Sequence, residues 1–150
     1  MKSIFDQTDR SSIIERIEAI DSNHTANWGK MNVYQMVKHN VYRNDWILGN
    51  GRFTYYHAFI GKIFGKMVLK KMIKDEKPFD KSIPTSAPFK IKELDGDLES
   101  DKLKWISTII DYKDFDNPDF IHDFFGKMTK EQIGILVYKH CDHHLRQFGL

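Results

Sequence analysis

The sequence lacks several features that would place it in a particular class of protein. Cys141 is the only cysteine, so no disulfide can form within the chain. No run approaches ~18 uninterrupted apolar residues, so we expect no helix that spans a membrane. The first twelve residues, MKSIFDQTDRSS, contain no apolar segment of the kind found in secretory signals. These absences together lead us to expect a cytoplasmic protein without a membrane partner.

Familiar nucleotide-binding and catalytic motifs are also missing. There is no GxGxxG after a strand-like run and no P-loop. There is no HExxH, because Cys141, Asp142 and His143 lie between His140 and His144. The Glu-x-x-His pairs of a di-iron bundle are absent as well. Cys141 adjoins His140, but consecutive side chains on a helix diverge by ~100°, so a cysteine–histidine nucleophile is not indicated.

Charge gives no sign of a nucleic-acid partner. Lysine and arginine number 23 against 21 acidic residues, a formal net charge of +2. The densest basic group is a set of five lysines, Lys62, Lys66, Lys70, Lys71 and Lys74. Several of these share one helical face, which is typical of a solvated surface; a phosphate patch is the alternative.

Apolar spacing predicts an all-α protein that forms one domain over residues 1–150. Steps of three and four recur in five segments, and no strand-like alternation is present. The expected helices cover residues 8–20 (with a cap at Asp6 or Thr8), 32–48, 52–73, 97–112 and 129–148. Two of them begin with capping boxes, at Asn32 with Gln35 and at Thr129 with Gln132.

The segments between these helices carry their own expectations. Residues 75–89 contain Pro78, Pro84 and Pro88, so a structured loop is expected to cross one end of the bundle and line a site. Gly61 and Gly65 lie four apart in the third helix and would allow another helix to approach closely. The same aromatic helix offers a face for a homodimer.

The last helix carries the clearest candidate site. His140 and His144 lie four apart, so they share a face with Leu136 and Gln147, and two imidazoles there can reach one metal ion. His143 lies ~100° away on the flank, and Asp142 points towards solvent. The alternative is that His140 and His144 are core histidines satisfied by hydrogen bonds. Cys141 is either a thiolate ligand or a small semi-buried residue.

A third histidine, His39, falls in the second predicted helix. It shares a stripe with Met36, Arg43 and Trp46, on the opposite side from the most apolar stripe. The helical wheel therefore leaves open whether His39 faces inward or lies on a flank. His24 and His57 are expected to have no role in a site.

These patterns together resemble the DinB/YfiT-like superfamily of metalloenzymes. The resemblance rests on MNVYQMVKHN, which contains His39, and on HCDHHLRQ, which contains His140 and His144. The segment FFGKMTKEQIGILVYKHCDHHLRQFG and the loop PTSAPF resemble, more narrowly, a subfamily of uncharacterised proteins with an HxxHHLRQFG ending. The resemblance implies a four-helix bundle, here with an additional short N-terminal helix, and His39, His140 and His144 as ligands of a divalent metal ion.

The resemblance also implies a class of function. Three neutral imidazoles leave the ion with an open position, as in catalytic sites. Zinc or nickel suits such ligands best, and iron or manganese is less favoured. Gln147 is expected to orient His144 or a substrate, or else to bond the backbone at the helix end. Arg43 would hold a carboxylate or phosphate, or pair with a surface acid. We take Arg43 and Gln147 as candidate catalytic residues.

The favoured activity is thiol-dependent transfer to a small-molecule substrate, with a low-molecular-weight thiol as partner. Metal-dependent hydrolysis is the alternative enzyme. Two alternatives are not enzymes: a stress-related protein that binds metal for structure, and a metal-free dimerising helical module.

Overall fold

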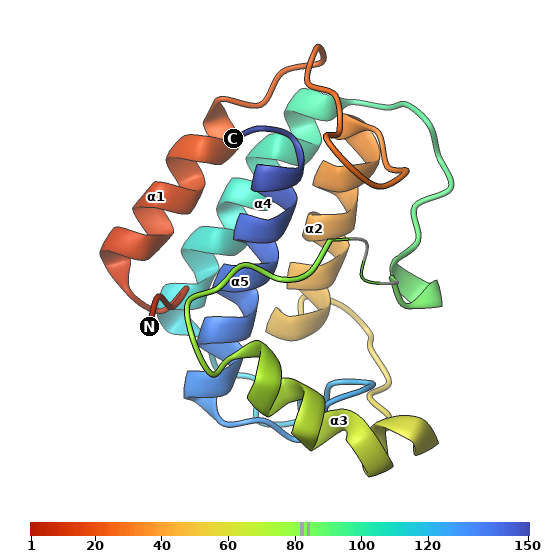
Figure 1. The fold of residues 1–150 in the computed structure, drawn as a ribbon. Helices are drawn as coiled ribbons and strands as arrows, with labels where there is room; N and C mark the ends of the chain where they lie inside the picture. Colours follow the sequence, from red (N-terminus) through yellow and green to blue (C-terminus); the bar gives the residue numbers. More distant parts are fainter. Residues whose placement is uncertain (82, 84) are drawn as a thin grey trace.

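The structure is a computed structural model, and it describes residues 1–81, 83 and 85–150. Its helices are α1 (Gln7–Glu18), α2 (Val33–Leu48), α3 (Phe59–Met72), α4 (Leu98–Asp111) and α5 (Lys130–Gln147), with short 3-10 helices η1 (Ala87–Phe89) and η2 (Tyr112–Asp114) (Figure 1). The described ranges contain no β-strand; one isolated bridge pairs His122 with Gly126. The all-α prediction is therefore confirmed. No described helix is both long and apolar enough to cross a bilayer.

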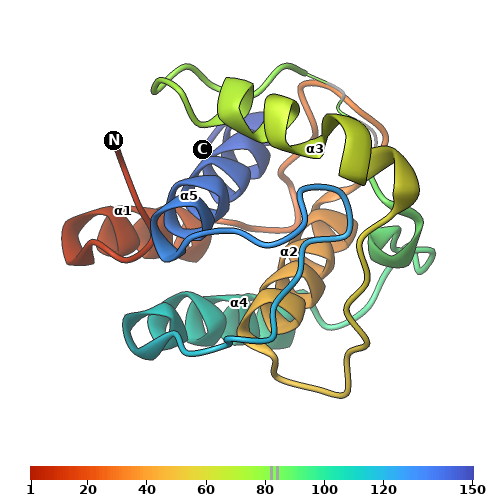
Figure 2. The ribbon, with the colours of Figure 1, turned by 90° about the horizontal axis from the view of Figure 1, so that it is seen from below.

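Four of the helices pack in a ring. α2 packs against α4 and α5, and α1 packs against the same two helices (Figure 2). The sequence led us to treat the N-terminal helix as an addition to the bundle, but α1 is one of its four members. Ile13 and Ile17 on α1 are fully buried, and Arg16 forms an ion pair of 2.8 Å with Asp142 on α5. Asp142 is therefore half-buried and paired, which corrects the expectation that it points towards solvent.

The two helices that carry the candidate histidines begin as the sequence predicts. Both capping boxes are present: Asn32 with Gln35 opens α2, and Thr129 with Gln132 opens α5. At its other end α2 stops at Gly49, whose φ of 81° is left-handed and favours glycine. Capping fixes where each helix begins, and hence which side chains point into the bundle.

The remaining helix, α3, lies outside the ring and crosses one end of it (Figures 1 and 2). Its inner side packs on α5 through a second apolar cluster made of Leu69, Ile73, Phe125, Ile135 and Leu136. Lys139 on α5 donates to the carbonyls of Met72 and Asp75 at the C-terminal end of α3. These contacts hold α3 in place across one end of the ring of helices.

The predicted start of this helix, at residue 52, is wrong by seven residues. Residues 53–58 are not helical, because this segment is held against the bundle by specific contacts. Tyr55 donates its hydroxyl hydrogen to the Trp46 carbonyl at 2.8 Å, and the Ala58 amide donates to the Asp123 carbonyl at 2.8 Å. Tertiary contacts outweigh the helical spacing of the apolar residues here.

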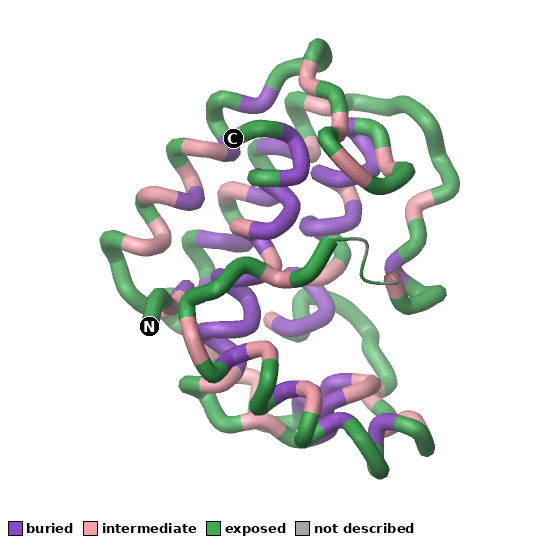
Figure 3. The backbone as a smooth tube through the Cα atoms, in the orientation of Figure 1, coloured by how far each residue is buried: buried purple, intermediate pink, exposed green. Residues whose placement is uncertain are grey.

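The small residues of α3 do serve close packing, but their partner is a loop. A Cβ added at Gly61 or Gly65 would collide with the backbone carbonyl of Phe124. The outer side of α3 exposes a row of large apolar side chains, Phe59, Ile60, Ile63, Phe64 and Met67 (Figure 3). A homodimer through this face stays a prediction.

Candidate metal centre

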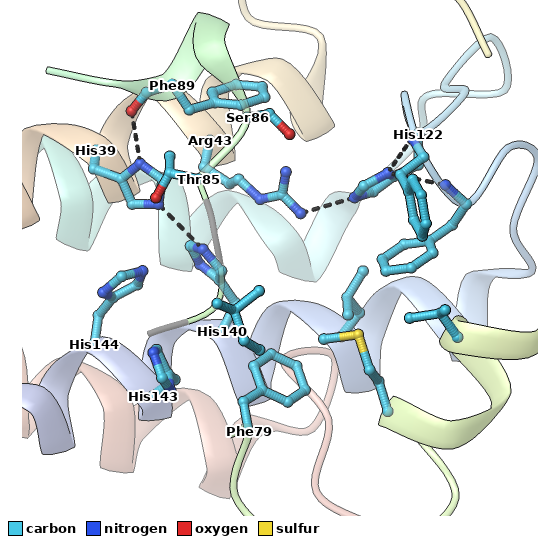
Figure 4. A pocket seen from close by; sticks show the side chains of 16 residues that line it. His39, Arg43, Phe79, Thr85, Ser86, Phe89, His122, His140, His143 and His144 are labelled. Atoms are coloured by element: carbon cyan, nitrogen blue, oxygen red, sulfur yellow. Dashed lines mark hydrogen bonds between the residues drawn. The ribbon is translucent and has the colours of Figure 1, made fainter. Parts of the chain in front are cut away.

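Three histidines from two helices converge inside the bundle, beside α3 and the loop that precedes η1. His39 comes from α2, and His140 and His144 come from α5 (Figure 4). One ring nitrogen of each lies within 4.8 Å of those of the other two. The structure therefore brings together the three side chains that the sequence singled out.

His39 is buried, with 3% of its surface exposed, so the question left open by the helical wheel is settled. Its Nδ1 lies 2.9 Å from the carbonyl oxygen of Phe89 in η1. A carbonyl only accepts hydrogen bonds, so Nδ1 carries the proton and donates it. The lone pair of a neutral His39 is then on Nε2, which lies 3.2 Å from Nε2 of His140.

His144 is oriented in the same way by a different partner. Its Nδ1 lies 2.9 Å from Oε1 of Gln147, and the Gln147 amide in turn donates to the carbonyl of Trp28. The amide oxygen accepts from Nδ1, which leaves the lone pair of His144 on Nε2. Gln147 therefore does both things that the sequence offered as alternatives, since it orients His144 and bonds the backbone.

Burial keeps all three imidazoles neutral. It lowers the pKa of His39 to about 4, and it also lowers the pKa of His140 and of His144, with further lowering from neighbouring histidines. A neutral imidazole is the form that ligates metal. Zn–N bonds of about 2.0–2.1 Å place two nitrogens of a tetrahedral site about 3.3 Å apart. The observed 3.2 Å between His39 and His140 fits that spacing.

Two neighbouring residues of α5, His143 and Cys141, stay outside the cluster. His143 packs its ring against Trp28 and Phe79, with centroids 5.8 and 6.1 Å away. Cys141 is fully buried rather than semi-buried, and burial raises the pKa of its thiol to about 12. A thiol with that pKa stays protonated at neutral pH, so Cys141 is a core residue.

A pocket of about 430 Å³ opens beside the three histidines. The predicted loop forms one wall through Phe79, Ile83, Thr85, Ser86 and Phe89, and α3 forms another through Val68 and Met72. The loop therefore lines the pocket beside the histidines, and the expectation that it lines a site stays a prediction. Ser82 and Pro84, the latter part of PTSAPF, lie outside the described residues. His140 is the least buried of the three histidines and faces this space.

A second polar group in the same pocket was not predicted from the sequence. Arg43 Nη2 donates to His122 Nε2 at 2.8 Å, and His122 Nδ1 lies 2.9 Å from Asp123 Oδ1. Burial lowers the pKa of His122 to about 4, so its ring stays neutral. Burial raises the pKa of Asp123, but the hydrogen bond from His122 and the positive charge of Arg43 outweigh it and bring that pKa to about 2.

A tight turn presents His122 to the pocket. The backbones of His122 and Gly126 exchange two hydrogen bonds, of 3.1 and 2.9 Å. Gly126 has a φ of 69°, and a Cβ there would strike the ring of His57. A glycine at this position is thus required by the turn and by its neighbour. The sequence signal for this group was weak: one histidine beside one acidic residue, four residues before a glycine.

Comparison with known proteins identifies a family but no characterised relative. No curated protein and no solved structure gave a significant match. A family model whose description reads "Protein of unknown function (DUF1569)" matches residues 5–149. The match covers nearly the whole chain, including all three clustered histidines, and the protein therefore belongs to the DUF1569 family.

Proposed function

We propose that this DUF1569 protein is a metal-dependent enzyme that binds one divalent ion through Nε2 of His39, His140 and His144. The observation that carries the proposal is the position of the lone pairs. Phe89 and Gln147 each accept a hydrogen bond from an Nδ1–H, so the lone pairs of neutral His39 and His144 lie on Nε2, the atoms available to the cluster. An ion there would be coordinated by these lone pairs.

The protein ligands number three, which is the count typical of catalytic zinc sites. His140 faces the pocket, so the remaining position would be open to a substrate. Zinc or nickel suits three imidazoles best, ahead of iron or manganese. Such an ion would lower the pKa of a bound thiol or water and so supply a nucleophile at neutral pH. The protein's own contribution is to orient the imidazoles and surround the site with apolar walls.

Thiol-dependent transfer is the activity we favour, because the chain resembles the DinB/YfiT-like superfamily. Two observations support the resemblance: the ring of four helices and the origin of one histidine from the second helix and two from the last. The apolar side chains around the pocket would shelter a thiolate from water. Hydrolysis by a metal-bound water is the competing reaction at the same site.

Metal content is the first test. We would measure it by inductively coupled plasma mass spectrometry on untagged protein, beside His140→Ala and the matched control His143→Ala. His143 is the next histidine on the same helix, but it lies outside the cluster. We expect about one ion per chain in wild type and in the control, and none in His140→Ala. Wild type that stays empty after incubation with zinc, nickel and iron would refute the proposal.

The reaction class is tested next, on the metal-loaded protein. A panel of low-molecular-weight thiols would be incubated with small electrophiles, with a thiol-free arm that detects hydrolysis. Transfer that requires both thiol and metal supports the transferase, whereas turnover without thiol supports the hydrolase. If neither occurs and chelation lowers the melting temperature by many degrees, the ion is structural.

A further inference from the structure

Arg43 is a cation whose charge is not matched by a direct partner. It lies one helical turn beyond His39 on α2, and it lines the pocket between the histidine cluster and His122 (Figure 4). No carboxylate among the described residues lies within ion-pair distance of its guanidinium. Among the described residues, its buried Nε has no hydrogen-bond partner. Within the same residues it makes one hydrogen bond, from Nη2 to the neutral imidazole of His122.

His122 links Arg43 to an acid, Asp123. The Asp123 carboxylate accepts from His122 Nδ1 and from the backbone amide of Phe124 at 2.8 Å. Asp123 thus holds the His122 ring in place but does not contact the guanidinium. An arginine that served only to stabilise the fold would be expected to pair directly with the acid. Here no carboxylate of the described residues occupies the fork of N–H donors, and Arg43 lines the pocket.

Packing fixes the direction of that fork. The guanidinium lies 5.3 Å from the ring centre of Trp46 and 5.4 Å from that of Phe89. Contacts of this kind hold the plane of the group and leave its edge to make hydrogen bonds. Arg43 is also the only lysine or arginine that lines the pocket within the described ranges. A carboxylate would accept two parallel hydrogen bonds from such an edge.

The rest of the pocket indicates the body of the ligand. Beyond Arg43 the walls are mostly apolar: Val68, Met72, Phe79, Phe124, Phe125 and Leu136. A pocket of about 430 Å³ is in the size range of sites for small organic molecules. One cationic anchor beside a large apolar surface suits a molecule with one acidic group and an otherwise apolar body.

We propose that Arg43 binds the carboxylate of the substrate, so that the pocket takes a carboxylic acid with an apolar body whose reacting group reaches the histidine cluster. The part about the reacting group rests on the proposed function. The carboxylate site itself does not, because Arg43, His122 and Asp123 all lie outside the metal-ligand set.

The test compares hexanoate with hexanol, which differ in the carboxylate but share an apolar chain. Binding to the full chain would be measured by isothermal titration calorimetry, once with zinc and once after chelation. We expect hexanoate to bind at least about tenfold more tightly than hexanol in both conditions, as a bidentate arginine contact would give. Equal affinities, or no binding of hexanoate at millimolar concentration, would overturn the inference.

Two variants test whether Arg43 causes the preference for hexanoate over hexanol. In Arg43→Met the preference for hexanoate should disappear, while hexanol affinity is kept. The variant should fold, because an unbranched apolar chain replaces a cation between Trp46 and Phe89. Arg43→Lys keeps the charge without the fork, so it should bind hexanoate more weakly than wild type does. Hexanoate affinity that is unchanged in either variant would refute the assignment.

The two proposals fail in different ways. A preference for hexanoate that appears only with zinc would mean that the ion holds the carboxylate, which overturns the Arg43 site and leaves the metal site standing. A preference that survives in chelated protein and in His140→Ala, alongside wild type that holds no metal, would support the Arg43 site and refute the proposed metalloenzyme.

Discussion

Acid should destabilise the metal-free protein through buried His122, and the size of the effect follows from its surroundings. Burial lowers the pKa of His122 from 6.5 to about 4 in the folded state. A histidine with a lowered folded-state pKa binds its proton more readily when the chain is unfolded. Its contribution to stability is therefore complete above pH 6.5 and is lost as the pH falls from there towards 4.

The loss of stability from His122 is large between pH 7 and pH 5 and small above pH 7. Unfolded-state and folded-state pKa values of 6.5 and about 4 give a loss of about 2 kcal/mol from this one group between pH 7 and pH 5. The same relation gives almost no change between pH 8 and pH 7. His39, with a similar pKa, should contribute a similar loss when no metal is present. The total loss of stability in wild type would therefore not show how much of it is due to His122.

A comparison of two proteins isolates the contribution. Wild type and His122→Gln would be unfolded with urea in chelator at pH 8, 7 and 5, with circular dichroism as the readout. The variant should lose about 2 kcal/mol less than wild type between pH 7 and pH 5, whatever its stability at pH 7. An unchanged m-value would show that both proteins unfold by the same transition. Identical losses in the two proteins would refute the argument that His122 is neutral because it is buried.

Two further predictions concern packing and support of the cluster. Gln147→Ala removes the group that accepts from His144, so metal affinity should fall by about tenfold to a hundredfold in a chelator-competition assay; unchanged affinity would show that Gln147 does not support the site. Gly61→Ala places a Cβ against the Phe124 carbonyl, so urea unfolding should show a loss of about 1–3 kcal/mol although alanine favours the helix; a more stable variant would contradict the close approach.

Local signals were sufficient to predict the helices that carry the site. The capping boxes at Asn32 and Thr129 are short-range features. Each joins the residue before the helix to the residue three positions later, and so marks where the helix begins. The face shared by His140 and His144 follows from the spacing along one rigid helix, which later packing does not change. Where long-range contacts determine the backbone, the prediction from local spacing was wrong. Residues 53–58 have helical spacing but are not helical, and they make hydrogen bonds to the carbonyls of Trp46 and Asp123.

The burial of His39 could not be predicted from the sequence of its own helix. The helical wheel places His39 opposite the most apolar stripe of α2. The helix α2 packs on α4. What buries His39 is Phe89, fifty residues away, whose carbonyl accepts from Nδ1 and whose short helix covers the ring. When a loop buries a histidine, apolar spacing along the histidine's own helix does not indicate that burial. Only the resemblance to a superfamily pointed to His39.

The Arg43–His122–Asp123 chain was missed for a related reason, and the reason is informative about function. Its members come from a helix and from a loop 79 residues away, so no spacing in the sequence connects them. A buried cation linked to its acid only through a neutral imidazole gains less than a direct pair would. Since Arg43 lines the pocket and no carboxylate of the described residues pairs with it directly, the arrangement favours a ligand that completes it over a role in fold stability alone. The same logic applies to the histidine cluster, where Phe89 and Gln147 accept from Nδ1 and leave the Nε2 lone pairs of His39 and His144 for the cluster. Both arrangements favour the proposal of a ligand that enters the pocket.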